Sequence, residues 1–250
     1  MKILIDSHVH IYPHYDIETL LSSFEQRIVI HNADIGVIML TERYGVDVFK
    51  DILSLNKAEN LVSDESSILL CKSGKPDIII VSGRQIACAE RIEVLALATR
   101  NVFNDGRNIC DSINEVINAK GIPVLAWGVG KWMFKRKSIV ESVLKTFTPN
   151  QLLVGDTSLR PIFWRLPRLM SAAMKKRFRV VVGSDPLPSK DDERIVGQYA
   201  NLVSDATIDT SKALTPQIVE ILRSSQMTIV GRRAGVFEFV KRITVRTNDN

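Results

Sequence analysis

The sequence predicts an α/β protein in which strands and helices alternate around one (β/α) barrel. Short β-branched runs alternate with longer helical stretches, which favours a parallel sheet covered by helices. The chain has 250 residues, of which 45% are hydrophobic. That length is ordinary for one barrel, and the apolar content provides for a large core. An open, doubly wound sheet is the alternative that the same alternation allows.

The expected strands are short runs that are apolar on both faces, as parallel strands buried between helices should be. In chain order they are residues 2–5, 35–40, 68–70, 78–81, 94–98, 122–126, 152–154 and 180–183. No glycine-rich dinucleotide fingerprint comes after the first of these runs, which argues against a Rossmann-type cofactor site. The number of runs therefore favours the barrel over the open sheet.

Helical stretches lie between these strands, at residues 17–32, 47–55, 111–120, 138–147, 165–177 and 215–225. Asp111 is the expected N-cap of the third stretch, and Gly121 comes after it as a stop signal. Thr215 and Pro216 open the last stretch, since a capping residue before a proline is typical of a helix start.

We expect residues 1–250 to form a single domain with a frayed tail at 247–250, because no linker, repeat or low-complexity tract interrupts the chain. No apolar run is long enough to span a bilayer, and residues 3–5 are too few for a signal peptide. A cytoplasmic location is therefore the expectation. Three widely spaced cysteines form no CxxC pair, which fits a reducing compartment.

Two histidines, His8 and His10, come directly after the first expected strand. Residues two apart on a strand point to the same side, so both rings can project into the mouth of a barrel. Barrel active sites lie at this carboxyl end of the strands, and imidazole is a good ligand for zinc, iron and similar cations. This spacing predicts a pair of metal ligands, although two polar loop histidines are the plainer alternative.

The segment around these histidines, ILIDSHVHIYP, is similar to the opening of the PHP (polymerase and histidinol phosphatase) phosphoesterases and of the wider amidohydrolase superfamily. Residues 182–185, VGSD, resemble the segment that ends a late strand in these proteins, and residues 186–203 are similar to the next segment of the PHP proteins. The resemblance implies a TIM-like or distorted seven-to-eight-stranded barrel. It also implies that Asp185 binds metal or accepts a proton from water, as a catalytic residue.

Several positions depart from the family pattern. Gln85 stands where a bridging glutamate is usual, Trp127 replaces a strand-ending histidine, and Pro186 replaces a last histidine. Thr41, Glu42 and Arg43 occupy the place of an aspartate–histidine pair. The ligand set is therefore degenerate.

The residues that remain, His8, His10 and Asp185, imply a mononuclear site for zinc, manganese or iron. Three protein ligands and a water are what catalytic zinc requires. Glu42 and Glu93 are further candidates for a fourth ligand or a base.

Three cations come after expected strands and so lie at the same face as the histidines. They are Arg84, Lys131 and Arg160, with Arg160 the leading candidate to bind a substrate phosphate or carboxylate. A surface salt bridge is the plainer alternative for each of them.

The sequence thus predicts a metal-dependent hydrolase that acts on a small anionic substrate, such as a phosphoester. The alternative is a catalytically degenerate PHP-like barrel that binds RNA or another polyanion. The net charge of +5, and the lack of any acidic residue from Thr157 to Ser184, keep that alternative open. No integral membrane segment is expected.

Overall fold

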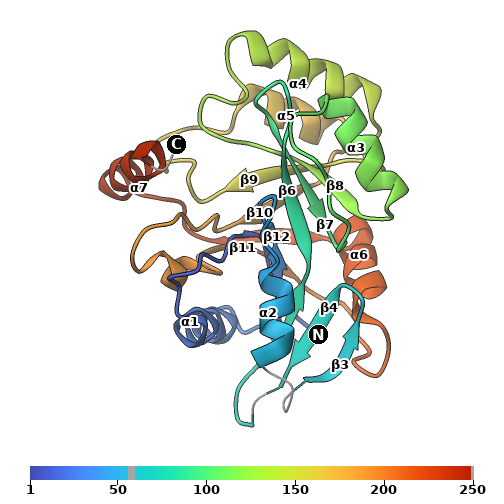
Figure 1. The fold of residues 1–250 in the computed structure, drawn as a ribbon, viewed down its shortest axis with the longest axis vertical. Coiled ribbons are helices and arrows are strands. Elements are labelled where there is room, and N and C mark those ends of the chain that lie inside the picture. Colours follow the sequence, from blue (N-terminus) through green and yellow to red (C-terminus); the bar gives the residue numbers. More distant parts are fainter. Residues whose placement is uncertain (56–59, 72, 249–250) are drawn as a thin grey trace.

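The computed structural model describes residues 1–55, 60–71 and 73–248, which form two mixed β-sheets flanked by helices (Figure 1). The seven-stranded sheet has the order β12-β11-β1-β2-β5-β4-β3, and the five-stranded sheet has the order β10-β9-β8-β7-β6. The first sheet contains β1 (Ile3–Val9), β2 (Ile35–Leu40), β3 (Asn60–Asp64), β4 (Ser67–Leu70), β5 (Asp77–Val81), β11 (Tyr199–Val203) and β12 (Met227–Gly231). The second contains β6 (Gly83–Ala87), β7 (Glu93–Leu97), β8 (Ile122–Ala126), β9 (Leu153–Thr157) and β10 (Val180–Gly183).

The expected closed barrel, TIM-like or PHP-type, is wrong, because both sheets are open. A (β/α) barrel requires parallel strands that each pair with two neighbours until the ring closes. Here β11 runs antiparallel along one edge of β1, where a closing parallel strand would have to lie. In the second sheet, β7 runs antiparallel to both β6 and β8. Among the strands that the structure describes, the pairs that run parallel are β1–β2, β2–β5, β8–β9 and β9–β10.

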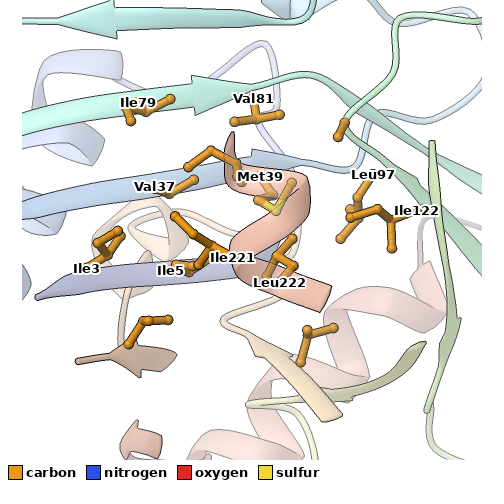
Figure 2. Close-up of a cluster of buried hydrophobic side chains, with 14 of the residues drawn as sticks. Ile3, Ile5, Val37, Met39, Ile79, Val81, Leu97, Ile122, Ile221 and Leu222 are labelled. Carbon is orange, nitrogen blue, oxygen red and sulfur yellow. The ribbon is translucent and has the colours of Figure 1, made fainter. Parts of the chain in front are cut away.

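The main core lies between the two sheets (Figure 2). Ile3 and Ile5 of β1 point into it, and so do residues of β8 and β9 from the opposite sheet. Leu4, between these two isoleucines, packs on the outer side against helices. Both faces of β1 are therefore buried, as its continuous apolar sequence predicts. The helix α6 (Leu214–Ser224) adds Ile221 and Leu222 to the same core.

Helices cover the outer face of each sheet. The seven-stranded sheet is covered by α1 (Ile17–Ile30) and α2 (Val48–Leu55), whose buried residues share a cluster with β1, β2 and β5. The five-stranded sheet is covered by α3 (Ile109–Asn118), α4 (Lys135–Thr146) and α5 (Arg168–Lys175). Figure 1 shows these three helices together at one end of the molecule.

The ends of the helices agree only in part with the predictions from the sequence. The N-cap of α3 is Asn108, whose side chain accepts a hydrogen bond from the Cys110 amide, whereas Asp111 lies inside the first turn. The sequence did not predict the last helix, α7 (Val236–Asn248). The frayed tail expected at 247–250 overlaps the end of α7, while residues 249 and 250 lie outside the described part of the chain. No helix within the described ranges is long and apolar enough to cross a membrane.

Two of the contacts between the sheets lie near the candidate site. The backbone amide of Asp185, just after β10, donates to the carbonyl of His8 in β1 over 2.8 Å. At the other place, the end of β2 meets β6 through an isolated bridge between Glu42 and Arg84. Both places lie at the carboxyl ends of β1 and β2, where the sequence places its candidate site.

Candidate metal centre

Three buried side chains converge at the junction of β1 and β10. The Nε2 atoms of His8 and His10 lie 3.1 Å apart. Asp185 Oδ1 lies 3.5 Å from His8 Nε2 and 3.7 Å from His10 Nε2. The structure therefore brings together the three residues that the sequence singles out as metal ligands, in a group that could hold a metal ion.

A local irregularity in β1 turns both histidines toward this point. The register between β1 and β2 shifts between Asp6 and Val9. Before the shift, Ile3 and Ile5 face the inner core, but after it Val9 packs in the outer cluster. Because side chains alternate along a strand, the shift moves the inward positions from odd to even numbers. His8 and His10 consequently share the inner side.

Gly183 at the end of β10 allows Asp185 to reach the histidines. A Cβ atom on Gly183 would lie 2.4 Å from both the amide nitrogen and the Cβ of His8. That contact is far inside van der Waals distance, so any side chain here would push β10 away from β1. The glycine of the GSD segment thus has a packing role that does not depend on any bound ligand.

Other residues fix the orientation of Asp185. Thr157, at the end of β9, donates its hydroxyl to Asp185 Oδ2 over 2.9 Å, which leaves Oδ1 facing the histidines. The backbone of Asp185 has a left-handed φ of 50°, which is unusual for a residue with a side chain. The buried Arg242 of α7 donates to the Asp185 carbonyl over 2.7 Å and stabilises this conformation.

Asp6 stabilises the same junction between β1 and β10 through hydrogen bonds. Its carboxylate accepts hydrogen bonds from the amides of Ser184 and Gly197 and from the Ser184 hydroxyl. Burial raises the pKa of Asp6 to about 6, although these hydrogen bonds oppose the rise. Asp6 therefore ties β1 to the segment after β10 without facing the three converging atoms.

His10 lies in surroundings that disfavour a proton. Burial and the neighbouring His8 lower the pKa of His10 to about 3, while Asp185 partly opposes the change. The Gln85 side chain hydrogen-bonds His10. At neutral pH His10 is thus a neutral imidazole, the form that binds metal.

The donor set and its spacing fit a single divalent cation. Two neutral imidazoles and a carboxylate suit zinc, iron or manganese. Ligand atoms around a tetrahedral zinc, with bonds of about 2.0–2.1 Å, lie roughly 3.4 Å from one another. The three measured separations of 3.1, 3.5 and 3.7 Å are close to that value.

The two glutamates considered as further ligands have other partners. Glu42 is buried, accepts a hydrogen bond from the Phe49 amide over 2.7 Å and pairs with Arg84 over 2.6 Å. Glu93 forms an ion pair with Lys131. In the described residues (1–55, 60–71 and 73–248), no further histidine, cysteine or acidic side chain joins His8, His10 and Asp185 as a candidate metal ligand.

The three predicted anion-binding cations are also engaged in ion pairs. Arg160 is 5% exposed and makes a two-pronged contact with Asp156, with its Nη2 atom 2.6 Å from Asp156 Oδ2. Tyr199 donates its hydroxyl to the same carboxylate. Arg84 and Lys131 pair with Glu42 and Glu93 respectively. A role for these cations in substrate binding stays a prediction.

Sequence reasoning gave no role to Asp6, Thr157 or Arg242. Thr157 is the last residue of β9, a position that could have pointed to it, whereas Asp6 lies in the middle of β1. Arg242 carries no such signal, because it lies in the unpredicted helix α7, 57 positions from the residue it contacts.

No family model and no curated protein matches the sequence. Solved structures do resemble it. PsfC from Pseudomonas syringae superposes with a TM-score of 0.61 at 11% identity, over 99% of this chain and 97% of that one. The lesion-specific endonuclease PfuEndoQ from Pyrococcus furiosus superposes with a TM-score of 0.51 at 10% identity, over 92% of this chain. The match spans 59% of the endonuclease.

At these identities the similarities establish a shared fold and nothing about activity. The arrangement of strands and helices thus recurs in PsfC and in an endonuclease. The similarities do not identify the ligands, the substrate or the family of this chain.

Proposed function

We propose that the protein is a metal-dependent hydrolase that binds one divalent cation through His8, His10 and Asp185 and acts on a small phosphoester. The observation that carries the proposal is the convergence of three buried ligand atoms from β1 and β10 at separations suited to one ion. With only three protein ligands, such a site leaves positions for water and substrate, as catalytic sites do.

Each residue of the centre has a definable part in this chemistry. A bound divalent cation would supply a Lewis acid and a water whose pKa falls to about 7. His10 binds without first losing a proton, because its burial keeps it neutral. Thr157 holds Asp185 Oδ2, so that Oδ1 alone is directed at the ligand position, as metal ligand or as proton acceptor.

The shared fold supports phosphoester chemistry by analogy alone. PfuEndoQ is an endonuclease, and an endonuclease cleaves phosphodiesters. Fold analogy does not transfer a substrate, so both small phosphomonoesters and lesion-containing DNA belong in the assay.

Metal binding decides the proposal. Protein purified without chelator should contain about one equivalent of zinc, manganese or iron by elemental analysis. His8→Ala and His10→Ala should each remove most of it, while His31→Ala, at the end of α1, is the matched control and should retain it. If no tested cation binds the apo protein more tightly than about 0.1 mM, the hydrolase proposal fails.

A polyanion-binding role without catalysis is the second candidate. Five cations of the segment between Thr157 and Ser184 are exposed: Arg165, Arg168, Lys175, Lys176 and Arg177. If this is the function, RNA should bind with an affinity that falls steeply with salt, and neutralising residues 175–177 together should weaken binding. If these cations are only a solvated surface, the same triple change should leave hydrolysis unaltered.

A further inference from the structure

A small recess opens between the loop after β2 and the start of β6. It has a volume of about 300 Å³ and is lined by Arg43, Tyr44, Gly45, Val46, Asp47, Arg84, Gln85, Val102 and Phe103. The lining comes from three places in the chain: the loop after β2, the strand β6 and the loop after β7. The recess therefore joins the segments that follow β2 and β7 to the start of β6.

Two residues connect the recess to the metal centre. Gln85 lines the recess, and its side chain hydrogen-bonds His10. Arg43 also lines it and acts electrostatically on His10. The Arg43 guanidinium lies 5.2 Å from the centre of the Tyr12 ring and donates to its hydroxyl, and the Tyr12 ring centre is 6.1 Å from that of His10. The Tyr12 ring thus links Arg43 to His10.

The charged side chains that line the recess differ in whether they already form ion pairs. Arg84 pairs with Glu42 at 2.6 Å, and Asp47 pairs with Arg100 at 3.1 Å. Arg43 is exposed, and no carboxylate in the described part of the chain forms an ion pair with it. Its hydrogen bond to Tyr12 uses one nitrogen of a guanidinium that has five donors. Arg43 is therefore the cation here that can receive an anion without breaking an ion pair.

The remaining wall is apolar. Tyr44 and Val102 are exposed large side chains, at 61% and 69%, and Phe103 is buried behind them. Exposed apolar groups that rim a recess beside a cation are typical of a site that binds an amphipathic small molecule. A volume of about 300 Å³ is at the lower end of ligand-binding cavities, which run from about 300 to 1,000 Å³.

We propose that this recess is the substrate subsite, in which Arg43 binds the anionic group beside the metal centre and Tyr44, Val102 and Phe103 contact a short apolar substituent. The proposal rests on the proposed function and narrows it to small organic phosphomonoesters. Arg43 stands where the related families carry an aspartate–histidine pair, so the subsite belongs to this chain rather than to the general pattern.

Calorimetric binding of two probes, inorganic phosphate and phenyl phosphate, tests the subsite in metal-free and zinc-loaded protein. Arg43→Gln should weaken both probes about tenfold or more, because a hydrogen bond to a charged group is lost. Arg223→Gln is the matched control, since Arg223 is exposed on α6 and absent from the recess. If Arg43→Gln leaves both affinities within twofold of the parent protein, the proposal is overturned.

A second variant tests the apolar wall. Tyr44→Ala should weaken phenyl phosphate several-fold and leave inorganic phosphate unchanged, because only the former has a ring to contact the wall. Equal effects on both probes would contradict the assigned wall. Elemental analysis of the same samples separates the two proposals. A variant that keeps its metal but loses the probes supports the subsite, whereas parent protein that binds the probes but no metal refutes the hydrolase and leaves only an anion site.

Discussion

At the scale of single residues, Asp185 has two carboxylate oxygens in different surroundings. Oδ2 accepts the Thr157 hydroxyl, and Oδ1 faces both histidines. Thr157→Val keeps the shape of the side chain but removes that donor, so the carboxylate can rotate. We expect metal affinity to fall about 10- to 100-fold, the usual effect of losing a hydrogen bond that orients a ligand.

Zinc titration of Thr157→Val checks this expectation. Thr157→Ser should restore most of the affinity, because it restores the hydroxyl. Thr146→Val, which removes an exposed hydroxyl from α4, is the control for the substitution itself. Unchanged zinc affinity in Thr157→Val would show that Asp185 holds its orientation without this hydrogen bond.

Only some residues of the candidate site could be predicted from the sequence. His8, His10 and Asp185 could be found because they lie at or just after the ends of strands and because the two histidines are two positions apart. Asp6 could not be ranked, since its partners, Ser184 and Gly197, are contributed by a distant segment. A side chain that supports a site through tertiary contacts leaves no local pattern in the sequence.

At the scale of elements, the approach of β10 to β1 depends on Gly183. Gly183→Ala would place a Cβ atom 2.4 Å from the His8 amide nitrogen. We expect a loss of about 1–3 kcal/mol of stability from overpacking, together with loss of zinc binding as Asp185 is displaced. Urea unfolding and zinc titration measure the two effects.

Gly155→Ala is the matched control in the neighbouring strand β9. The nearest atom to its added Cβ would be a Val124 methyl at 3.0 Å, a contact that small side-chain shifts can relieve. This variant should therefore bind zinc like the parent protein. Zinc binding lost equally in both variants would point to general damage to the sheet and not to the β1–β10 junction.

The contact between β3 and α6 predicts a pH dependence of stability. Asp64 accepts hydrogen bonds from the amide and hydroxyl of Thr215 at the start of α6. Burial alone would raise the pKa of Asp64, but these hydrogen bonds outweigh it and lower the pKa below its ordinary value. A lowered pKa in the folded state stabilises the fold above the ordinary carboxyl pKa, and this contribution is lost as pH falls through the folded-state pKa.

Asp64→Asn should therefore be less stable than the parent protein at neutral pH. The gap should narrow as pH falls below the ordinary carboxyl pKa and the parent carboxylate becomes protonated. Urea unfolding of both proteins across this range gives the comparison directly. A constant gap at all pH values would mean that the ionised form of Asp64 contributes nothing.

The strands that the sequence predicted are apolar on both faces, whereas several that it did not predict carry polar or exposed side chains. The predicted runs at 35–40, 122–126 and 180–183 match β2, β8 and β10, which have apolar residues on both faces. The sequence did not predict β12, in which most side chains are exposed or half-exposed, or β6, which carries Arg84 and Gln85. Periodic apolar content detects buried strands, but edge and site-lining strands lack it.

At the scale of the whole molecule, the candidate metal centre joins the two sheets, because its three residues come from β1 and from the segment after β10. A cation that binds only the folded state should therefore stabilise the entire protein. Free zinc at about 100 times its dissociation constant should add roughly 2.7 kcal/mol. Urea unfolding with zinc, and again after adding a chelator, measures the gain and its reversal.

His8→Ala should show no such gain, because its ligand set is incomplete. The same protein without zinc gives the direct cost of the substitution, which keeps the two effects separate. Equal stabilisation of parent and variant by zinc would place the binding site elsewhere in the molecule.

The predicted closed barrel was wrong because the direction of strand pairing is a property of the whole molecule. The alternation of strands and helices reports how many buried strands exist, but not the direction in which neighbours pair. The antiparallel insertion of β11 beside β1 joins residues about 200 positions apart, as in the pairing of Ile3 with Val203. Such pairing is set by tertiary packing, which no local pattern encodes.

The link between Asp6 and Ser184 spans 178 positions of the chain. Closing a loop of that size has an entropic cost, which must be overcome before His8 and Asp185 can come together. Contacts of such long range also form slowly in folding. A nascent polypeptide that ends before Asp185 has two histidines and no complete ligand set. Capture of the ion should therefore coincide with completion of the tertiary structure, and release of the ion should report the first separation of β1 from β10.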